Sequence, residues 1–140
     1  MQTFFIMLAF GVFAGHRHSP SDPGAPGYGP PLHRHYETEV FLVLEGRYLY
    51  EVDGNLAAGD LVGVPSGAAH AFTNVSDLPS RQLVLMLPAM DAVGFFSGLG
   101  KLMAASRPNM AALNAYGAPW GVEFLGAPIH ATDDAVPSSK

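Results

Sequence analysis

The alternation of apolar and polar residues predicts a series of short strands over most of the chain. Residues 2–14, 40–44 and 81–87 are largely apolar, as buried strands are, and residues 47–52 alternate as a half-buried strand does. Turn signals separate these segments; one example is the Asp53-Gly54 pair, which is typical of a two-residue hairpin. Short strands at such regular spacing are typical of an antiparallel sandwich or barrel, so we expect an all-β domain.

Helical spacing replaces this pattern after Pro88. Apolar residues that recur in residues 90–105 predict one helix whose inner face would carry Val93, Phe96, Leu99 and Met103. A second helix is expected from about Pro108 to Gly117, because proline is favoured in a first turn and glycine after a helix end. Residues 120–125 suit a short strand or an extended segment. We expect one domain over residues 1–130 and a flexible tail over 131–140.

Composition narrows the classes of function. A chain of 140 residues, 49% apolar and only 14% charged, fits a single compact domain. Its net charge of −5 and its seven scattered lysines and arginines argue against a nucleic-acid partner. There is no cysteine, so any metal ligands must be histidine and carboxylate side chains.

The apolar run near the N-terminus is interpreted as a strand. It covers about eleven residues, 4–14, whereas roughly 20 are needed to span a bilayer. No positive charge precedes it and no clear cleavage site follows it, which disfavours a signal peptide. We therefore expect a cytoplasmic protein without a membrane partner.

Four side chains form the main candidate site: His33, His35, Glu39 and His70. The first three lie two and four positions apart in sequence, so on one strand their side chains would share a face. His70 would open a neighbouring strand. Imidazole nitrogens with one carboxylate suit a divalent first-row transition metal. A second pair, His16 and His18, has no accompanying carboxylate at a recognisable spacing and is interpreted as part of a solvated loop.

Two sequence blocks that contain these residues resemble the paired signatures of the cupin superfamily. The first block has its pattern residues at Gly27, His33, His35, Glu39 and Gly46, and the second at Gly59, Pro65, Gly67, His70 and Asn74. The resemblance implies a cupin double-stranded β-helix, which is a jelly-roll barrel, followed here by C-terminal helices. It also implies one metal ion held by His33, His35, Glu39 and His70. The metal would be iron, nickel, manganese, cobalt or copper, with zinc also possible.

Residues 112–126 resemble the ends of small bacterial cupins related to quercetin 2,3-dioxygenase. This looser resemblance implies a catalytic role for Glu39 as a base when it shifts off the metal. It also implies a homodimer, which would cover the edge of a barrel with few N-terminal strands.

Strand parity predicts an apolar pocket for a small-molecule substrate beside the metal. Phe41 and Val43 continue the inward face of the Glu39 strand, and Phe72 follows His70. Leu83 or Leu85 on the last strand and Phe96 on the first helix complete the predicted lining. No lysine or arginine is expected at an inward position, which favours a flat or apolar molecule.

Three classes of function remain open. The first is a metal-dependent oxidoreductase, a quercetinase-like dioxygenase that acts on a small aromatic or enolic substrate. The second is a non-redox isomerase, cyclase or lyase in which the metal polarises a carbonyl. The third is a non-catalytic small-molecule-binding module, because one fold hosts all three.

Overall fold

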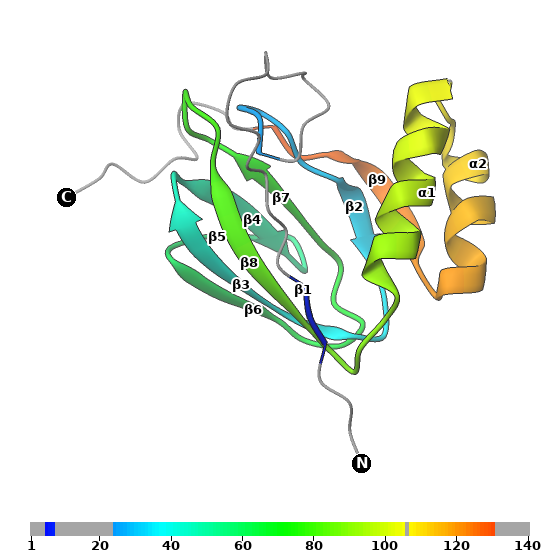
Figure 1. Cartoon of the computed structure of the whole chain (residues 1–140), viewed down its shortest axis with the longest axis horizontal. Coiled ribbons are helices and arrows are strands. Elements are labelled where there is room, and N and C mark those ends of the chain that lie inside the picture. Colours follow the sequence, from blue (N-terminus) through cyan, green and yellow to red (C-terminus); the bar gives the residue numbers. More distant parts are fainter. Residues whose placement is uncertain (1–4, 8–23, 106, 131–140) are drawn as a thin grey trace.

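A computed structural model describes residues 5–7, 24–105 and 107–130 of the chain (Figure 1). Among these residues the strands form two antiparallel sheets that face each other, and two helices lie beside one end of the sheets. The predicted all-β architecture with C-terminal helices is confirmed. The strands are β1 (Phe5–Met7), β2 (Pro31–Arg34), β3 (Thr38–Glu45), β4 (Tyr48–Val52), β5 (Asn55–Ala58), β6 (Leu61–Val64), β7 (His70–Asn74), β8 (Arg81–Leu87) and β9 (Glu123–Pro128).

The order of the strands brings distant parts of the sequence together. The first sheet has the order β1-β8-β3-β6, and the second has the order β5-β4-β7-β2-β9. In the second sheet His33 on β2 is directly opposite His70 on β7. The hairpin between β4 and β5 turns at Asp53 and Gly54, which both have positive φ angles, as a tight two-residue turn requires.

The main core fills the space between the sheets. Its largest buried side chains are aromatic: Phe41 packs on Tyr50 and Phe72 at ring-centroid distances of 5.3 and 5.5 Å. One buried polar pair interrupts this apolar packing, where the Tyr50 hydroxyl donates to Oε1 of Gln82 over 2.8 Å. The pair satisfies both groups, so it stabilises the interior without an unpaired polar atom.

The helices α1 (Ala92–Ala105) and α2 (Met110–Gly117) and the short 3-10 helix η1 (Ala118–Trp120) lie beside β9, the edge strand of the second sheet (Figure 1). A separate apolar cluster joins them, made of Phe95, Leu113, Val122 and Phe124. Of the predicted inner face of α1, Leu99 is confirmed, because it is half-buried against this cluster. The other three residues are wrong, because Val93, Phe96 and Met103 are 72%, 45% and 48% exposed and Phe95 is buried in their place.

The second helix begins after Asn109 and not at Pro108. The Asn109 side chain accepts a hydrogen bond from the Ala112 N–H over 2.9 Å, which caps the helix. Its end at Gly117 agrees with the prediction. The later segment is a strand, as the sequence suggested, although it begins at Glu123.

The N-terminal strand is confirmed for Phe5–Met7, which pair with β8. The rest of the predicted strand, the pair His16 and His18 and the predicted tail at 131–140 lie outside the described residues. Within the described ranges, no helix is long and apolar enough to cross a membrane.

Candidate metal centre

The three candidate ligands of the first sequence block lie on two strands and the bend between them. β2 ends at Arg34, residues 35–37 bend, and β3 begins at Thr38 in the other sheet. The prediction of a single strand was therefore wrong. The His35 carbonyl accepts a hydrogen bond from the Gly67 N–H over 2.8 Å, and this contact holds the bend where the chain crosses between sheets.

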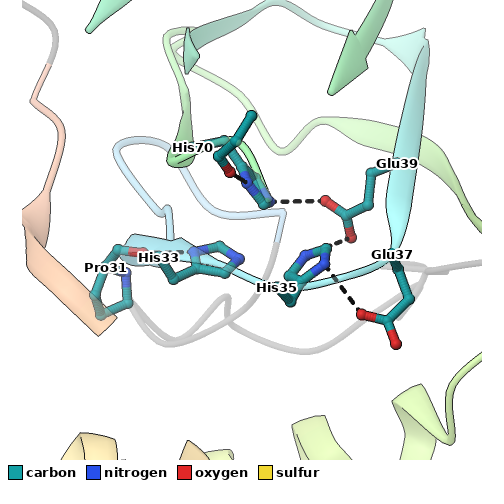
Figure 2. A network of polar contacts seen from close by, with 7 residues as sticks. Pro31, His33, His35, Glu37, Glu39 and His70 are labelled. Carbon is teal, nitrogen blue, oxygen red and sulfur yellow. Dashed lines mark hydrogen bonds and ion pairs between the residues drawn. The ribbon is translucent and has the colours of Figure 1, made fainter. Parts of the chain in front are cut away.

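The rings of His33, His35 and His70 converge, as Figure 2 shows. One ring nitrogen from each of His33, His35 and His70 lies within 4.8 Å of the other two. The His33 and His70 ring centroids are 4.3 Å apart, and His35 and His70 are 4.9 Å apart in an edge-on arrangement. The three residues form a cluster that is able to hold one metal ion.

Backbone contacts fix two of the imidazoles. His33 Nδ1 lies 2.7 Å from the Pro31 carbonyl, and His70 Nδ1 lies 3.0 Å from the Ala68 carbonyl. Because a carbonyl only accepts hydrogen bonds, both Nδ1 atoms carry the proton, and both Nε2 atoms keep a free lone pair. An Nδ1–H held by a carbonyl is the usual second contact of a metal-binding histidine.

Buried ring nitrogens without hydrogen bonds support the same conclusion. In the part of the chain that the structure describes, His35 Nδ1, His35 Nε2 and His70 Nε2 are buried and have no hydrogen-bond partner. A buried polar atom without a partner costs about 1–3 kcal/mol. A metal ion on the Nε2 side would remove this cost for two of the three atoms.

The Glu39 carboxylate lies beside the imidazoles and is only 5% exposed. Its Oε2 is 2.9 Å from His70 Nε2, and its Oε1 is 3.7 Å from His35 Nε2. The contact at 2.9 Å is short but does not have hydrogen-bond geometry. Adjacent ligands of one octahedral ion are about 3.0 Å apart when each metal–ligand bond is about 2.1 Å. The residues present therefore fit a metal with nitrogen and oxygen ligands.

Burial and mutual contacts set the protonation states. Burial, with a smaller effect of His70, lowers the pKa of His33 to about 4. Burial acts to raise the pKa of Glu39, but its contacts with His35 and His70 outweigh burial and lower that pKa to about 2. Burial similarly acts to lower the pKa of His35, but Glu39 and Glu37 outweigh it and the pKa is raised. At neutral pH His33 is thus neutral and Glu39 is anionic, which are the ligand forms that a metal requires, whereas the raised pKa of His35 favours a proton that metal binding would have to displace.

Part of the predicted pocket lies next to this cluster. Phe41 is buried, with its ring centroid 6.5 Å from that of His70. Val43 and Phe72 are half-buried and pack against the main core. These three residues occupy the barrel interior on the same side as the candidate ligands.

The other predicted pocket residues lie elsewhere. Leu83 and Leu85 are opposite Leu42 and Val40, so they are on the outer face of the sheet. Val84 and Met86 are buried on the inner face in their place. Phe96 is exposed on α1 and contacts the buried ring of Phe95.

A shallow hollow of about 460 Å³ lies between α2 and β9, lined by Asn114, Ala118, Gly121, Val122 and Glu123.

Sequence reasoning missed Glu37. Its Oε2 lies 3.2 Å from His35 Nδ1, and its side chain is 13% exposed. The available signal was a carboxylate two residues after a candidate ligand, in a segment interpreted as continuous strand.

One family model and several solved structures are similar to part of this chain. Residues 24–86 match the model described as the cupin domain. Among solved structures, the protein TT1209 from Thermus thermophilus is 31% identical with a TM-score of 0.43, over 46% of this chain and 65% of that chain. A predicted oxalate decarboxylase from Thermotoga maritima is 25% identical with a TM-score of 0.43, over 46% and 60%.

A salicylate 1,2-dioxygenase from Pseudaminobacter salicylatoxidans is 24% identical with a TM-score of 0.42, over 44% of this chain and 19% of that chain. The chain therefore spans less than two thirds of the length of each of these three proteins. No curated protein matches the chain significantly. The segment that matches the cupin-domain model contains both sequence blocks and all four candidate ligands.

Proposed function

We propose that this protein is a metal-dependent cupin oxidoreductase, a quercetinase-like dioxygenase that acts on a small aromatic or enolic substrate. One observation carries the proposal: ring nitrogens of His33, His35 and His70 lie within 4.8 Å of one another, beside the buried carboxylate of Glu39. The proposed ligands of the metal are His33, His35, Glu39 and His70.

The bound metal would supply Lewis acidity and, if it is redox-active, exchange electrons with oxygen or substrate. The chain's own residues would orient the reactants and move protons. Glu39 is the proposed base, because a carboxylate oxygen that is not held by the ion could accept the proton of an enol or phenol hydroxyl. Its position on the rigid strand β3 would keep that oxygen close to the reacting atoms.

The lining of the barrel supports an aromatic or otherwise apolar substrate. Phe41 lies beside the cluster and Phe72 packs on Phe41, while the Tyr50 hydroxyl is already bonded to Gln82. No lysine or arginine is among the buried residues that the structure describes, so a phosphorylated or carboxylated substrate would have no buried cationic partner. Offset or edge-on ring contacts with Phe41 or Phe72 would favour a flat molecule.

Oxygen consumption by the metal-loaded protein tests the proposal. Flavonols and 1,3-diketones would be supplied to protein loaded with iron, nickel, manganese, cobalt or copper, and His70→Ala would be the control. We expect substrate-dependent oxygen uptake that the variant loses. Turnover without oxygen in the zinc-loaded protein would instead identify an isomerase, cyclase or lyase. Tight ligand binding without turnover would identify a binding module.

A homodimer remains our proposal for the oligomeric state. Leucines on the outer face of the β3–β6 pair support it, because Leu42, Leu44 and Leu61 are 38%, 46% and 67% exposed. Exposed apolar surface of this kind favours association. Light scattering after gel filtration would measure the mass, and a monomer across the micromolar range would contradict the proposal.

A further inference from the structure

The three histidines differ in what faces their Nδ1 atoms. His33 and His70 each meet a backbone carbonyl, which no side-chain substitution removes. The Nδ1 of His35 is buried and lies 3.2 Å from the carboxylate of Glu37, and the backbone of Glu37 also contacts the His35 ring. Among the three histidines, His35 is therefore the one whose Nδ1 also has a side-chain acceptor, which a substitution at residue 37 would remove.

The backbone around His35 is not held by strand pairing in the way that the backbone of the other two histidines is. His35 and Glu37 lie in the bend between β2 and β3, outside the strand ladders that hold His33 and His70. The Gly67 N–H holds the His35 carbonyl but makes no contact that would orient the ring. Two carboxylates flank this imidazole, Glu39 towards Nε2 and Glu37 towards Nδ1.

Glu37 is not placed to be a ligand itself. Figure 2 shows its carboxylate beyond the His35 ring, on the side away from His33 and His70. The contact runs to Nδ1, whereas the nitrogen that faces Glu39 is Nε2. An ion at the cluster would thus have the His35 ring between itself and Glu37.

We propose that Glu37 is a positioning residue that holds the proton on His35 Nδ1 and so directs the Nε2 lone pair at the metal. This inference rests on the proposed metal centre. Partners of this kind raise the basicity of a ligating imidazole and fix its tautomer, and their loss typically lowers metal affinity 10- to 100-fold. Glu37 would do for His35 what the Pro31 and Ala68 carbonyls do for the other two histidines.

Zinc affinity, measured by competition with a chelator, would be compared among three variants and the wild type. We expect Glu37→Ala to bind Zn²⁺ about 10- to 100-fold more weakly, because His35 Nδ1 loses its side-chain acceptor. Glu37→Gln keeps an acceptor oxygen at the same position and should remain within a few-fold of wild type. Glu51→Ala removes a half-buried carboxylate on β4 and is the charge-matched control, with unchanged affinity expected.

A second readout follows the proton itself. In the zinc-loaded wild type labelled with ¹⁵N-histidine, the His35 Nδ1–H should give an exchange-protected signal shifted downfield by the carboxylate. Glu37→Ala should lose that protection. Glu37→Gln should keep a signal that is less shifted, since a neutral amide oxygen is a weaker acceptor. This second variant keeps the inference testable if Glu37→Ala does not fold.

The outcomes separate the inference from the proposed function. A wild type that binds no transition metal overturns the proposed metal centre and this inference with it. A wild type that binds zinc, with unchanged affinity in Glu37→Ala and an unchanged Nδ1–H signal in either variant, overturns the role of Glu37 alone.

Discussion

Asn74, at the end of β7, should be one of the most sensitive positions for stability. Its side chain is 2% exposed and makes four hydrogen bonds. Nδ2 donates to the carbonyls of Gly24 and Leu78 over 2.9 and 3.0 Å. Oδ1 accepts from the Ser76 N–H and the Ser80 hydroxyl over 2.8 and 2.9 Å. One amide thus fastens residue 24 and the loop after β7 to the barrel.

The Asn74→Ala variant loses all four bonds. At about 1 kcal/mol for each net hydrogen bond, and with water able to reach some of the released loop groups, the free energy of unfolding should fall by about 3–5 kcal/mol. Urea denaturation followed by circular dichroism measures this change. Asn55→Ala is the matched control, because the Asn55 amide is exposed and bonds at 3.2 and 3.5 Å, and it should cost less than about 1 kcal/mol.

A loss of less than about 1 kcal/mol in Asn74→Ala would refute this reasoning. It would mean that the loop finds other partners, or that the network contributes little beyond solvation. Because the network does not contact the histidine cluster, the folded fraction of the variant should bind metal with wild-type affinity.

Three further predictions concern backbone space, helix propensity and pH. Gly29→Ala should destabilise the fold by at least about 2 kcal/mol, because the added Cβ would overlap the Phe72 carbonyl oxygen. Gly63→Ala is the control, because a Cβ at that position meets no atom within 4 Å. Equal melting temperatures of the two variants would contradict the predicted overlap. Gly100→Ala should stabilise α1 by about 0.5–1 kcal/mol, because the helix interior there is open and alanine is the better helix former; a lower denaturation midpoint would count against it. Burial raises the pKa of Tyr48 to about 12. The contribution of this residue to stability should therefore be fully present below pH 10 and should fall by about 2 kcal/mol near pH 12. Absorbance of the native protein measures tyrosine ionisation, and ionisation of all five tyrosines near pH 10 would contradict this prediction.

For the candidate site, the sequence was informative where the spacing of metal-binding types of side chain along the chain was recognisable. The distances between His33, His35, Glu39 and His70 along the chain identified side chains that the fold brings together. Their arrangement on one strand was nevertheless wrong, because a bend at 35–37 also brings these residues to one place. A local pattern cannot reveal this crossover, since it depends on the Gly67 N–H, which is distant in sequence.

Apolar runs carried less information about orientation. On β8 the residues after Gln82 are apolar on both faces, so nothing local indicated that Val84 faces the core and Leu83 does not. The two polar residues of β8 gave conflicting indications, because Arg81 shares the outer face with Leu83 whereas Gln82 points inward, where its Oε1 accepts a hydrogen bond from the Tyr50 hydroxyl. On α1 the adjacent Phe95 and Phe96 posed the same problem, and packing against α2 and β9 decided which one is buried.

The metal content of untagged protein, together with that of the His70→Ala variant, tests the central claim most directly. Elemental mass spectrometry should find close to one divalent transition metal per chain in the wild type and little in the variant, because His70 supplies a buried Nε2 without another partner. Gly63→Ala, which leaves the cluster untouched, should retain the metal. A wild type that holds no transition metal and takes none up from solution, or a His70→Ala variant that holds as much as the wild type, would contradict the account.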